Sequence, residues 1–253
     1  EDFERWLKTK TSGFKQTKGE GLCFLTEEQN SPTFYRLSYL IKRFYPKAKI
    51  YRYSPINTDS QSEGLYSITN QHIVPKYDYS NANVIVSFQS DFLGELGSLN
   101  SIKDFSNRRD PDNTKGLNRL YTFESNYTLT GAKSDHRIKL KSTEIESALW
   151  VITHSLFRKG LNVSFISSDI KELIFKGSLQ HFGKFDRDVI ESIVKDLYKN
   201  KGKSLLLAGP QQPKSVHALV FLINKALGNQ DQTVSYLPKN YSNYNFNTLS
   251  NID

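Results

Sequence analysis

The stretch LYTFESNYTLTGAKSDHRIKLKSTEIESALWVI, from Leu120 to Ile152, decides the fold. A β-rich run covers Leu120 to Phe123 and, after a polar turn, a short basic strand covers Arg137 to Lys141. An apolar-periodic helix then runs from Thr143 to Phe157. Strands that alternate with helices predict an α/β fold with a parallel sheet.

The same alternation extends to both sides of this stretch. Gly21 to Thr26 and Ala48 to Tyr53 read as strands, and a helix begins after Ser31 and ends before Pro46, which makes one βαβ unit. Further strands are expected at Val84 to Phe88, Ser204 to Ala208 and Thr233 to Tyr236, and further helices at Asp2 to Phe14, Ser98 to Arg108, Asp169 to His181, Asp186 to Lys199 and Lys214 to Leu227. The pattern predicts open parallel sheets with helices on both faces.

Composition shifts divide the chain into four expected parts. Residues 1–20 form an N-terminal helical arm, and 21–158 form an α/β domain in which Ser54 to Ser80 is a long irregular excursion. Residues 159–239 combine a helical segment with a second α/β unit, and the Asn- and Ser-rich residues 240–253 form a linker. Because the chain begins at Glu1 and contains no Met, we interpret it as a segment of a longer or processed protein.

Composition also excludes several classes of protein. No apolar run approaches the roughly 20 residues that a membrane-spanning helix needs, so no direct membrane span is expected. The net charge of +8 is spread along the chain without a nucleic-acid motif, which argues against nucleic-acid binding and favours an acidic partner or anionic headgroups. A single cysteine, Cys23, excludes a disulfide framework and a cluster held by four cysteines; we expect it to be buried.

Ligands of open parallel sheets bind beyond the carboxyl ends of the strands, so the loops after Phe88, Phe123 and Ala208 are the expected site. None of these loops carries GxGxxG or GxxxxGK[ST], and an ordinary NAD or ATP site is therefore not expected. Asp91 and Glu124 follow neighbouring strands and could pair or hold a ribose, but capping a helix or pairing with Lys or Arg is the favoured interpretation.

Other candidate residues carry little chemistry. The histidines lack metal-ligand spacing such as HExxH, and no metal site is expected. The triplet Asp135-His136-Arg137 alternates faces along a strand, which favours a structural role, and no GxSxG elbow or Cys-His arrangement indicates a hydrolase.

Three runs of sequence resemble a known family. They are NVIVSFQSDFLGELGS from Asn83, LNRLYTFESNYTLTGAKSDHRIKLKSTEIESAL from Leu117, and KSLLLAGPQQPKSVHALVFLINKALGN from Lys203. In this order they resemble the central, Rossmann-like domains of molybdopterin oxidoreductases, over about Gly21 to Tyr236. The runs DFLG, TLTGAKSDHR and AGPQQPKSVHAL are more closely similar to the molybdopterin-like, cofactor-free part of the B subunit of bacterial alternative complex III, a quinol:cytochrome c oxidoreductase.

The resemblance implies that three loops have changed. In the active enzymes these loops usually read Gly-Ser-Asn, Asp-Pro-Arg and Gly-Thr-Asp and bind the guanine dinucleotide ends of the cofactor. The matching residues here are Gln89, Ser90 and Asp91, then Glu124, Ser125 and Asn126, and finally Ser142, Thr143 and Glu144. Glycine and arginine, which suit a phosphate, are replaced by Gln89 and Asn126. The resemblance thus implies a scaffold that has lost its ligand and has no catalytic residue.

The expected function follows from this resemblance. It is a non-catalytic structural domain of a respiratory complex, peripheral on the periplasmic side of the bacterial inner membrane, that supports an iron–sulfur domain or subunit. Iron–sulfur clusters and haems would belong to partner segments, together with a membrane-integral quinol-binding subunit and cytochrome c subunits. An alternative is a fragment of an active molybdenum enzyme that reduces a sulfur or nitrogen oxyanion, with Ser90, Asp91, Glu124 and Glu144 near molybdopterin guanine dinucleotide. A third is an independent α/β protein that binds a small molecule.

Overall fold

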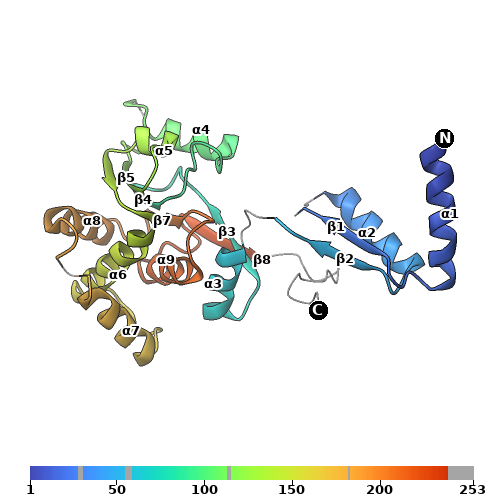
Figure 1. Cartoon of the computed structure of the whole chain (residues 1–253). Coiled ribbons are helices and arrows are strands. Elements are labelled where there is room, and N and C mark those ends of the chain that lie inside the picture. Colours follow the sequence, from blue (N-terminus) through green and yellow to red (C-terminus); the bar gives the residue numbers. More distant parts are fainter. Residues whose placement is uncertain (28–30, 55–58, 113–114, 182, 239–253) are drawn as a thin grey trace. The chain divides into compact units, whose positions relative to one another are not determined.

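The structure is a computed structural model that describes residues 1–27, 31–54, 59–112, 115–181 and 183–238 (Figure 1). The chain separates into two compact units, which are considered one at a time. The N-terminal residues up to Asn57 belong to unit 1, and Thr58–Lys239 forms unit 2. The expected linker at 240–253 lies outside the described residues. Across the described residues, no helix combines the length and apolar character needed to span a bilayer.

Unit 1 contains the predicted βαβ arrangement. Strands β1 (Cys23–Thr26) and β2 (Lys49–Arg52) pair in parallel, and helix α2 (Pro32–Phe44) connects them, so this prediction is confirmed. Pro32 occupies the first turn of α2, where a missing backbone N–H has no cost. Helix α1 (Asp2–Gln16) precedes β1 within unit 1 and has no buried residue.

The prediction that Cys23 is buried is wrong. The thiol is exposed, and the burial of β1 alternates between exposed and intermediate residues along the strand. Leu25, two residues further on and on the same side of the strand, is 68% exposed. An apolar run therefore predicted the strand correctly but not its burial, because one side of β1 is uncovered in unit 1.

Unit 2 is built on a four-stranded parallel sheet with the order β6-β5-β4-β7 (Figure 1). Strands β4 (Val84–Phe88) and β7 (Ser204–Ala208) are buried along their whole length, as continuous apolar runs predict for central parallel strands. Strands β5 (Arg119–Glu124) and β6 (His136–Lys139) extend the sheet on the other side of β4. The α/β fold with a parallel sheet is confirmed.

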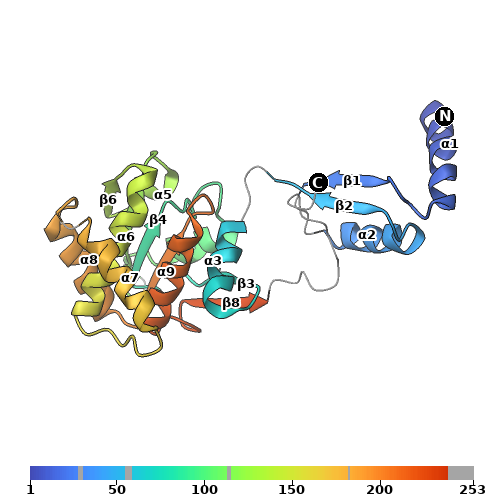
Figure 2. The same cartoon turned by 60° about the horizontal axis from the view of Figure 1, so that its bottom comes forward.

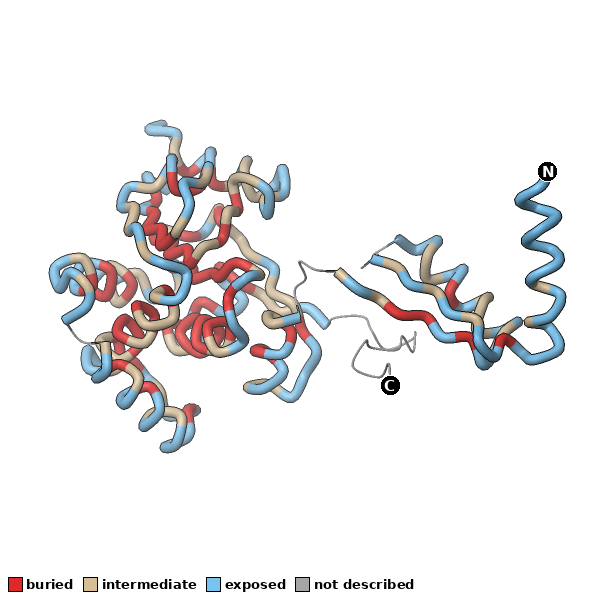
Figure 3. The backbone as a smooth tube through the Cα atoms, viewed as in Figure 1, coloured by how far each residue is buried: buried red, intermediate tan, exposed pale blue. Residues whose placement is uncertain are grey.

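Helices cover both faces of this sheet, and the two sides of β4 contribute to different cores. Val84, Val86 and Phe88 pack with the helices α6 (Ser142–Arg158), α8 (Arg187–Lys199) and α9 (Lys214–Ala226). Ile85, between them in sequence, points to the opposite core with Phe92 and Phe105, the latter from α4 (Leu99–Asn107). Figure 3 shows the central strands and the inner sides of these helices as buried. Unit 2 also contains the short helix α5 (Leu129–Ala132) and helix α7 (Ser168–Leu179).

The expectation that Ser54 to Ser80 is irregular is wrong for the described part of this range; residues 55–58 lie outside the described residues. This region contains α3 (Asp59–Thr69) and β3 (Ile73–Tyr77), and β3 pairs antiparallel with β8 (Val234–Pro238). The sequence did not indicate them, because α3 contains three Ser and a Gly and β3 contains Pro75, whereas both elements are stabilised by residues distant in the chain. The last strand is accordingly not part of the parallel sheet (Figure 2).

The parallel sheet combines strands from two of the expected parts of the chain, residues 21–158 and 159–239. Strands β4, β5 and β6 come from 21–158 and β7 from 159–239, yet β4 hydrogen-bonds to β7 directly. By contrast β1 and β2, which also fall in 21–158, pair with each other in unit 1. Strand β7, the first strand of the expected second α/β unit, therefore lies in the same sheet as β4, β5 and β6, whereas its last strand, β8, pairs with β3.

Candidate functional site

The three loops singled out by sequence meet at the carboxyl end of the parallel sheet. Gln89, Ser90 and Asp91 follow β4, Glu124 is the last residue of β5, and Ser142 begins α6 after β6. The order β6-β5-β4-β7 reverses direction at β4, because β5 and β7 lie on its two sides. Such a reversal is the place where open α/β sheets bind their ligands.

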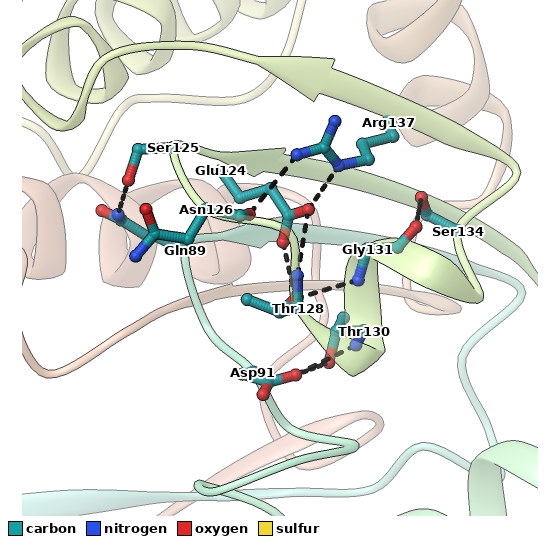
Figure 4. A network of polar contacts seen from close by, with 10 residues as sticks. All are labelled: Gln89, Asp91, Glu124, Ser125, Asn126, Thr128, Thr130, Gly131, Ser134 and Arg137. Carbon is teal, nitrogen blue, oxygen red and sulfur yellow. Dashed lines mark hydrogen bonds and ion pairs between the residues drawn. The ribbon is translucent and has the colours of Figure 1, made fainter.

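Gln89 is the centre of this arrangement. Its backbone has φ +55°, a left-handed conformation that favours glycine, directly after the buried strand β4. Its Nε2 donates to Ser125 Oγ at 2.6 Å and to Ser142 Oγ at 3.0 Å. The Ser142 hydroxyl also donates to Ser125 Oγ at 3.2 Å, so one glutamine side chain joins the ends of β4 and β5 to the start of α6. Figure 4 shows the contact between Gln89 and Ser125.

The loop after β7 closes the arrangement from the other side. Gln212 Nε2 donates to Gln89 Oε1 at 2.6 Å, and Gln211 Nε2 donates to the Gln89 backbone oxygen at 2.7 Å. A Cβ atom added to Gly209 would lie 2.1 Å from that same backbone oxygen, so the close approach of the two loops requires glycine. The sequence reasoning placed a site near this loop but missed Gln211 and Gln212; two consecutive amides after a buried strand were the available signal.

Asp91 is turned toward α5 rather than toward the Gln89 amide. Its Oδ1 accepts hydrogen bonds from the Thr130 backbone N–H at 2.9 Å and from the Thr130 hydroxyl at 2.8 Å (Figure 4). Ser90 is buried, its backbone N–H donates to Ser87 Oγ, and its carbonyl accepts from the same hydroxyl. These contacts fix the backbone of the first loop.

Glu124 is buried, with 1% of its side chain exposed, and forms an ion pair with Arg137 Nε at 2.5 Å. Its Oε2 accepts from the Thr128 hydroxyl at 2.6 Å. A Cβ atom on Gly131 would meet Glu124 Oε1 at 1.9 Å, which explains the glycine in α5. The interpretation that these carboxylates cap the following helix or pair with Lys or Arg agrees with the Glu124–Arg137 pair. Asp91 instead bonds to Thr130 of α5, whereas the helix that follows it is α4.

The Arg137 guanidinium makes three contacts in this network. Besides Glu124, its guanidinium donates from Nη2 to the Asn126 backbone oxygen at 3.4 Å and lies 4.7 Å from the centre of the Tyr127 ring. A guanidinium with these partners is held in place by a carboxylate, a carbonyl and an aromatic face. Thr128 was missed by sequence reasoning, which had favoured a structural role for the triplet that contains Arg137.

The remaining predicted positions are less involved. The Asn126 and Thr143 side chains are exposed and form no hydrogen bond within the described residues. Glu144 stabilises the start of α6, because the Lys141 backbone N–H donates to Glu144 Oε2 at 3.1 Å. Of the nine predicted residues, the structure brings Gln89, Ser125 and Ser142 into mutual contact and places Asp91 and Glu124 around α5.

A buried histidine lies close to the third loop. His217 in α9 is 4% exposed, and burial lowers its pKa to about 4, with a hydrogen bond to the Gln212 backbone opposing the shift. Its Nε2 has no hydrogen-bond partner in the described residues. The neutral imidazole is the form that this apolar position stabilises. Within the part of the chain that the structure describes, no group of three His, Cys, Asp or Glu side chains is arranged to hold a metal ion.

Comparison with known proteins shows the class of fold. The chain is similar to a solved structure, acetylene hydratase from Pelobacter acetylenicus, with a TM-score of 0.58 and 13% sequence identity. The match covers 92% of this chain but 33% of acetylene hydratase, so the chain spans about a third of the length of that enzyme. This likeness shows that the two proteins share a fold over the matched residues. No protein-family model and no curated protein matches the sequence.

Proposed function

We propose that this chain is a non-catalytic structural domain with a molybdopterin-oxidoreductase-like fold, in which the ligand crevice has been closed by the domain's own side chains. The observation that carries the proposal is the Gln89 amide, which hydrogen-bonds to Ser125, Ser142 and Gln212 at the point where the sheet order reverses. The polar groups of the strand ends bind one another there instead of facing an open crevice.

The residues of the crevice do not suit the pyrophosphate of a pterin dinucleotide. A pyrophosphate needs backbone N–H groups that it can approach closely, and usually a cation. At the first loop the side chain of Gln89 extends over the place where glycine would leave room, and Asp91 adds a carboxylate beside it. Arg137 is occupied by Glu124, so its charge is already neutralised.

The finer proposal concerns the assembly in which the domain works. By the resemblance of its three strand-loop runs, we assign it to the molybdopterin-like part of a respiratory quinol:cytochrome c complex, on the periplasmic face of the membrane. There it would support an iron–sulfur domain or subunit beside a membrane-integral quinol-binding subunit and cytochrome c subunits. A single cysteine fits this assignment, because clusters and haems then belong to other segments.

An active enzyme is the alternative, favoured by the fold likeness to acetylene hydratase. In that case the chain would be one part of a molybdenum oxidoreductase, and Ser90, Asp91, Glu124 and Glu144 would lie near molybdopterin guanine dinucleotide. The Gln89 contacts would then have to open when the cofactor enters, at the loss of three hydrogen bonds.

The test is elemental analysis for molybdenum and tungsten, with fluorescence of the oxidised pterin, on the protein purified from its native host. A known molybdopterin enzyme purified in parallel is the positive control. We expect less than about a tenth of an equivalent of metal and pterin, in a preparation that retains iron. Near-stoichiometric metal and pterin would overturn the structural-domain proposal and establish the enzyme alternative.

A further inference from the structure

Helix α2 of unit 1 has two apolar stripes, and its own unit covers only one of them. The inward stripe consists of Phe34, Ser38 and Ile41, at positions i, i+4 and i+7: the polar Ser38 is buried, and the apolar residues on either side of it are half-buried. A helix whose apolar residues all pack on the core of its own unit leaves no apolar stripe exposed. Helix α2 has further apolar residues beside the inward stripe.

The second stripe consists of Leu37, Leu40 and Phe44, at positions i, i+3 and i+7. Leu37 is 47% exposed and Phe44 is 70% exposed, while Leu40 is half-buried. Single exposed apolar residues are ordinary, but three in line over two turns form a continuous surface. This stripe adjoins the inward one, so the apolar face of α2 is wider than the part that its own unit covers.

Two arginines border this second stripe. Arg36 and Arg43 are seven residues apart on the side away from the inward stripe, a rise of about 10.5 Å along the helix. Both are exposed, and within the described residues neither has a hydrogen bond or ion pair. Helix α2 contains no acidic residue, and its third cation, Lys42, is already bonded to the Ala48 carbonyl at 2.6 Å.

The charge of the whole unit has the same sign. Residues 1–57 contain eleven Lys and Arg against six Asp and Glu, which gives +5 of the chain's net +8. Unit 1 also buries few apolar side chains, namely Ala48, Ile50 and Tyr51. A unit of this size with so small a core gains stability when another surface covers its exposed apolar residues. The covering surface must be apolar at its centre and acidic at its edge.

We infer that the stripe Leu37–Leu40–Phe44 of α2 is a docking surface for an acidic amphipathic helix of another polypeptide segment. That helix places apolar side chains on the stripe and carboxylates, about two turns apart, against Arg36 and Arg43. The inference does not depend on the proposed function, because unit 1 contains none of the crevice residues.

A photo-cross-linking experiment in the native host tests this surface. The photoreactive amino acid p-benzoylphenylalanine replaces Leu37 in the protein, and mass spectrometry identifies the cross-linked peptide. The same replacement at Leu99, which is 86% exposed on α4 of unit 2, is the control. We expect position 37 to give a defined peptide from a helix with alternating apolar and acidic residues, well above the background at position 99.

Charge reversal gives a matched second test. Arg36→Glu with Arg43→Glu should lower the cross-linking yield at position 37 about tenfold, because two attractions become repulsions. Lys8→Glu with Lys15→Glu, in α1, makes the same charge change at the same spacing in the same unit and should alter the yield less than about twofold. Replacing the identified carboxylates of the partner by Arg should restore the yield with the Arg36→Glu, Arg43→Glu protein.

Several results would overturn the inference. These are a yield at position 37 no higher than at position 99, a cross-link to lipid or to a second copy of this chain, a partner peptide without acidic residues, or an equal loss in both double variants. Circular dichroism of the purified variants verifies folding. If the arginine variant fails to fold, Arg substitution of the partner's carboxylates in the otherwise unchanged protein decides the question by the same yield.

Discussion

Gln89 and Gln212 are 123 residues apart in the sequence and are joined by a hydrogen bond of 2.6 Å from Gln212 Nε2 to Gln89 Oε1. The bond ties the end of β4 to the loop after β7, on the side of the sheet where a ligand of this fold would bind. Gln212 is 2% exposed, so the bond is sheltered from water. The contact links the strand ends of unit 2 in one polar network, in which the buried Gln212 Oε1 has no partner among the described residues.

The left-handed backbone of Gln89 predicts that a glycine variant at this position is more stable than an alanine variant. Gln89→Ala and Gln89→Gly both lose the side-chain hydrogen bonds and should both lower the free energy of unfolding. At φ +55° alanine retains the steric cost and glycine does not, so Gln89→Gly should be more stable than Gln89→Ala by about 1 kcal/mol in urea denaturation.

Gln180 is the control for this comparison, because it is exposed with a right-handed φ of −67° at the end of α7. There Gln180→Ala should be more stable than Gln180→Gly by about 0.5–1 kcal/mol. If alanine is also the more stable residue at position 89, the left-handed backbone there is not maintained in solution.

The buried carboxylate of Glu124 predicts a large loss on truncation. Glu124→Ala removes the partner of Arg137 and of the Thr128 hydroxyl and should lower the free energy of unfolding by about 3 kcal/mol. Glu124→Gln keeps the shape and should cost less than half of this. Glu191→Ala, in the exposed pair with Arg187, is the control and should leave the urea midpoint nearly unchanged. Equal midpoints for Glu124→Ala and Glu191→Ala would contradict the structure.

Gly64 predicts how tightly α3 packs on α9. A Cβ atom there would lie 2.4 Å from the Lys214 backbone oxygen, so Gly64→Ala must separate the two helices and should lower the free energy of unfolding of unit 2 by about 2 kcal/mol or more. Gly13→Ala in α1 has open space around the added methyl and should raise helicity in circular dichroism. A neutral Gly64→Ala would show that α3 does not pack at this distance.

His217 predicts a pH dependence of stability. Its folded-state pKa, about 4, lies below the unfolded value of 6.5, so between these values the unfolded state binds more protons. The stabilisation is fully present above pH 6.5 and is lost as the pH falls to about 4, by up to about 3 kcal/mol. His217→Leu should flatten this part of the profile in urea denaturation at each pH. An unchanged slope in His217→Leu would assign the effect to other groups.

The sequence alone determined most of the elements of unit 2. Largely apolar runs predicted Val84–Phe88 and Ser204–Ala208 with their observed limits, because a strand buried on both faces consists mainly of apolar residues. Helices α8 and α9 were predicted within one residue at either end, because apolar periodicity and Asp186 or Gly228 mark their limits. The position of the candidate site also followed, since parallel strands direct their loops to one edge of the sheet.

Only the tertiary structure decided that Cys23 is exposed, in which order the strands lie and which contacts the site residues make. The local sequence pattern shows how apolar and polar residues alternate along an element, whereas burial depends on which other element covers it. One side of β1 is uncovered, and α3 and β3 are stabilised by α9 and β8. The link between Gln89 and Gln212 exists because β7 lies beside β4, an adjacency set by packing over a long separation in sequence. The sequence determined which residues stand at the strand ends; the sheet order decided that they bind one another.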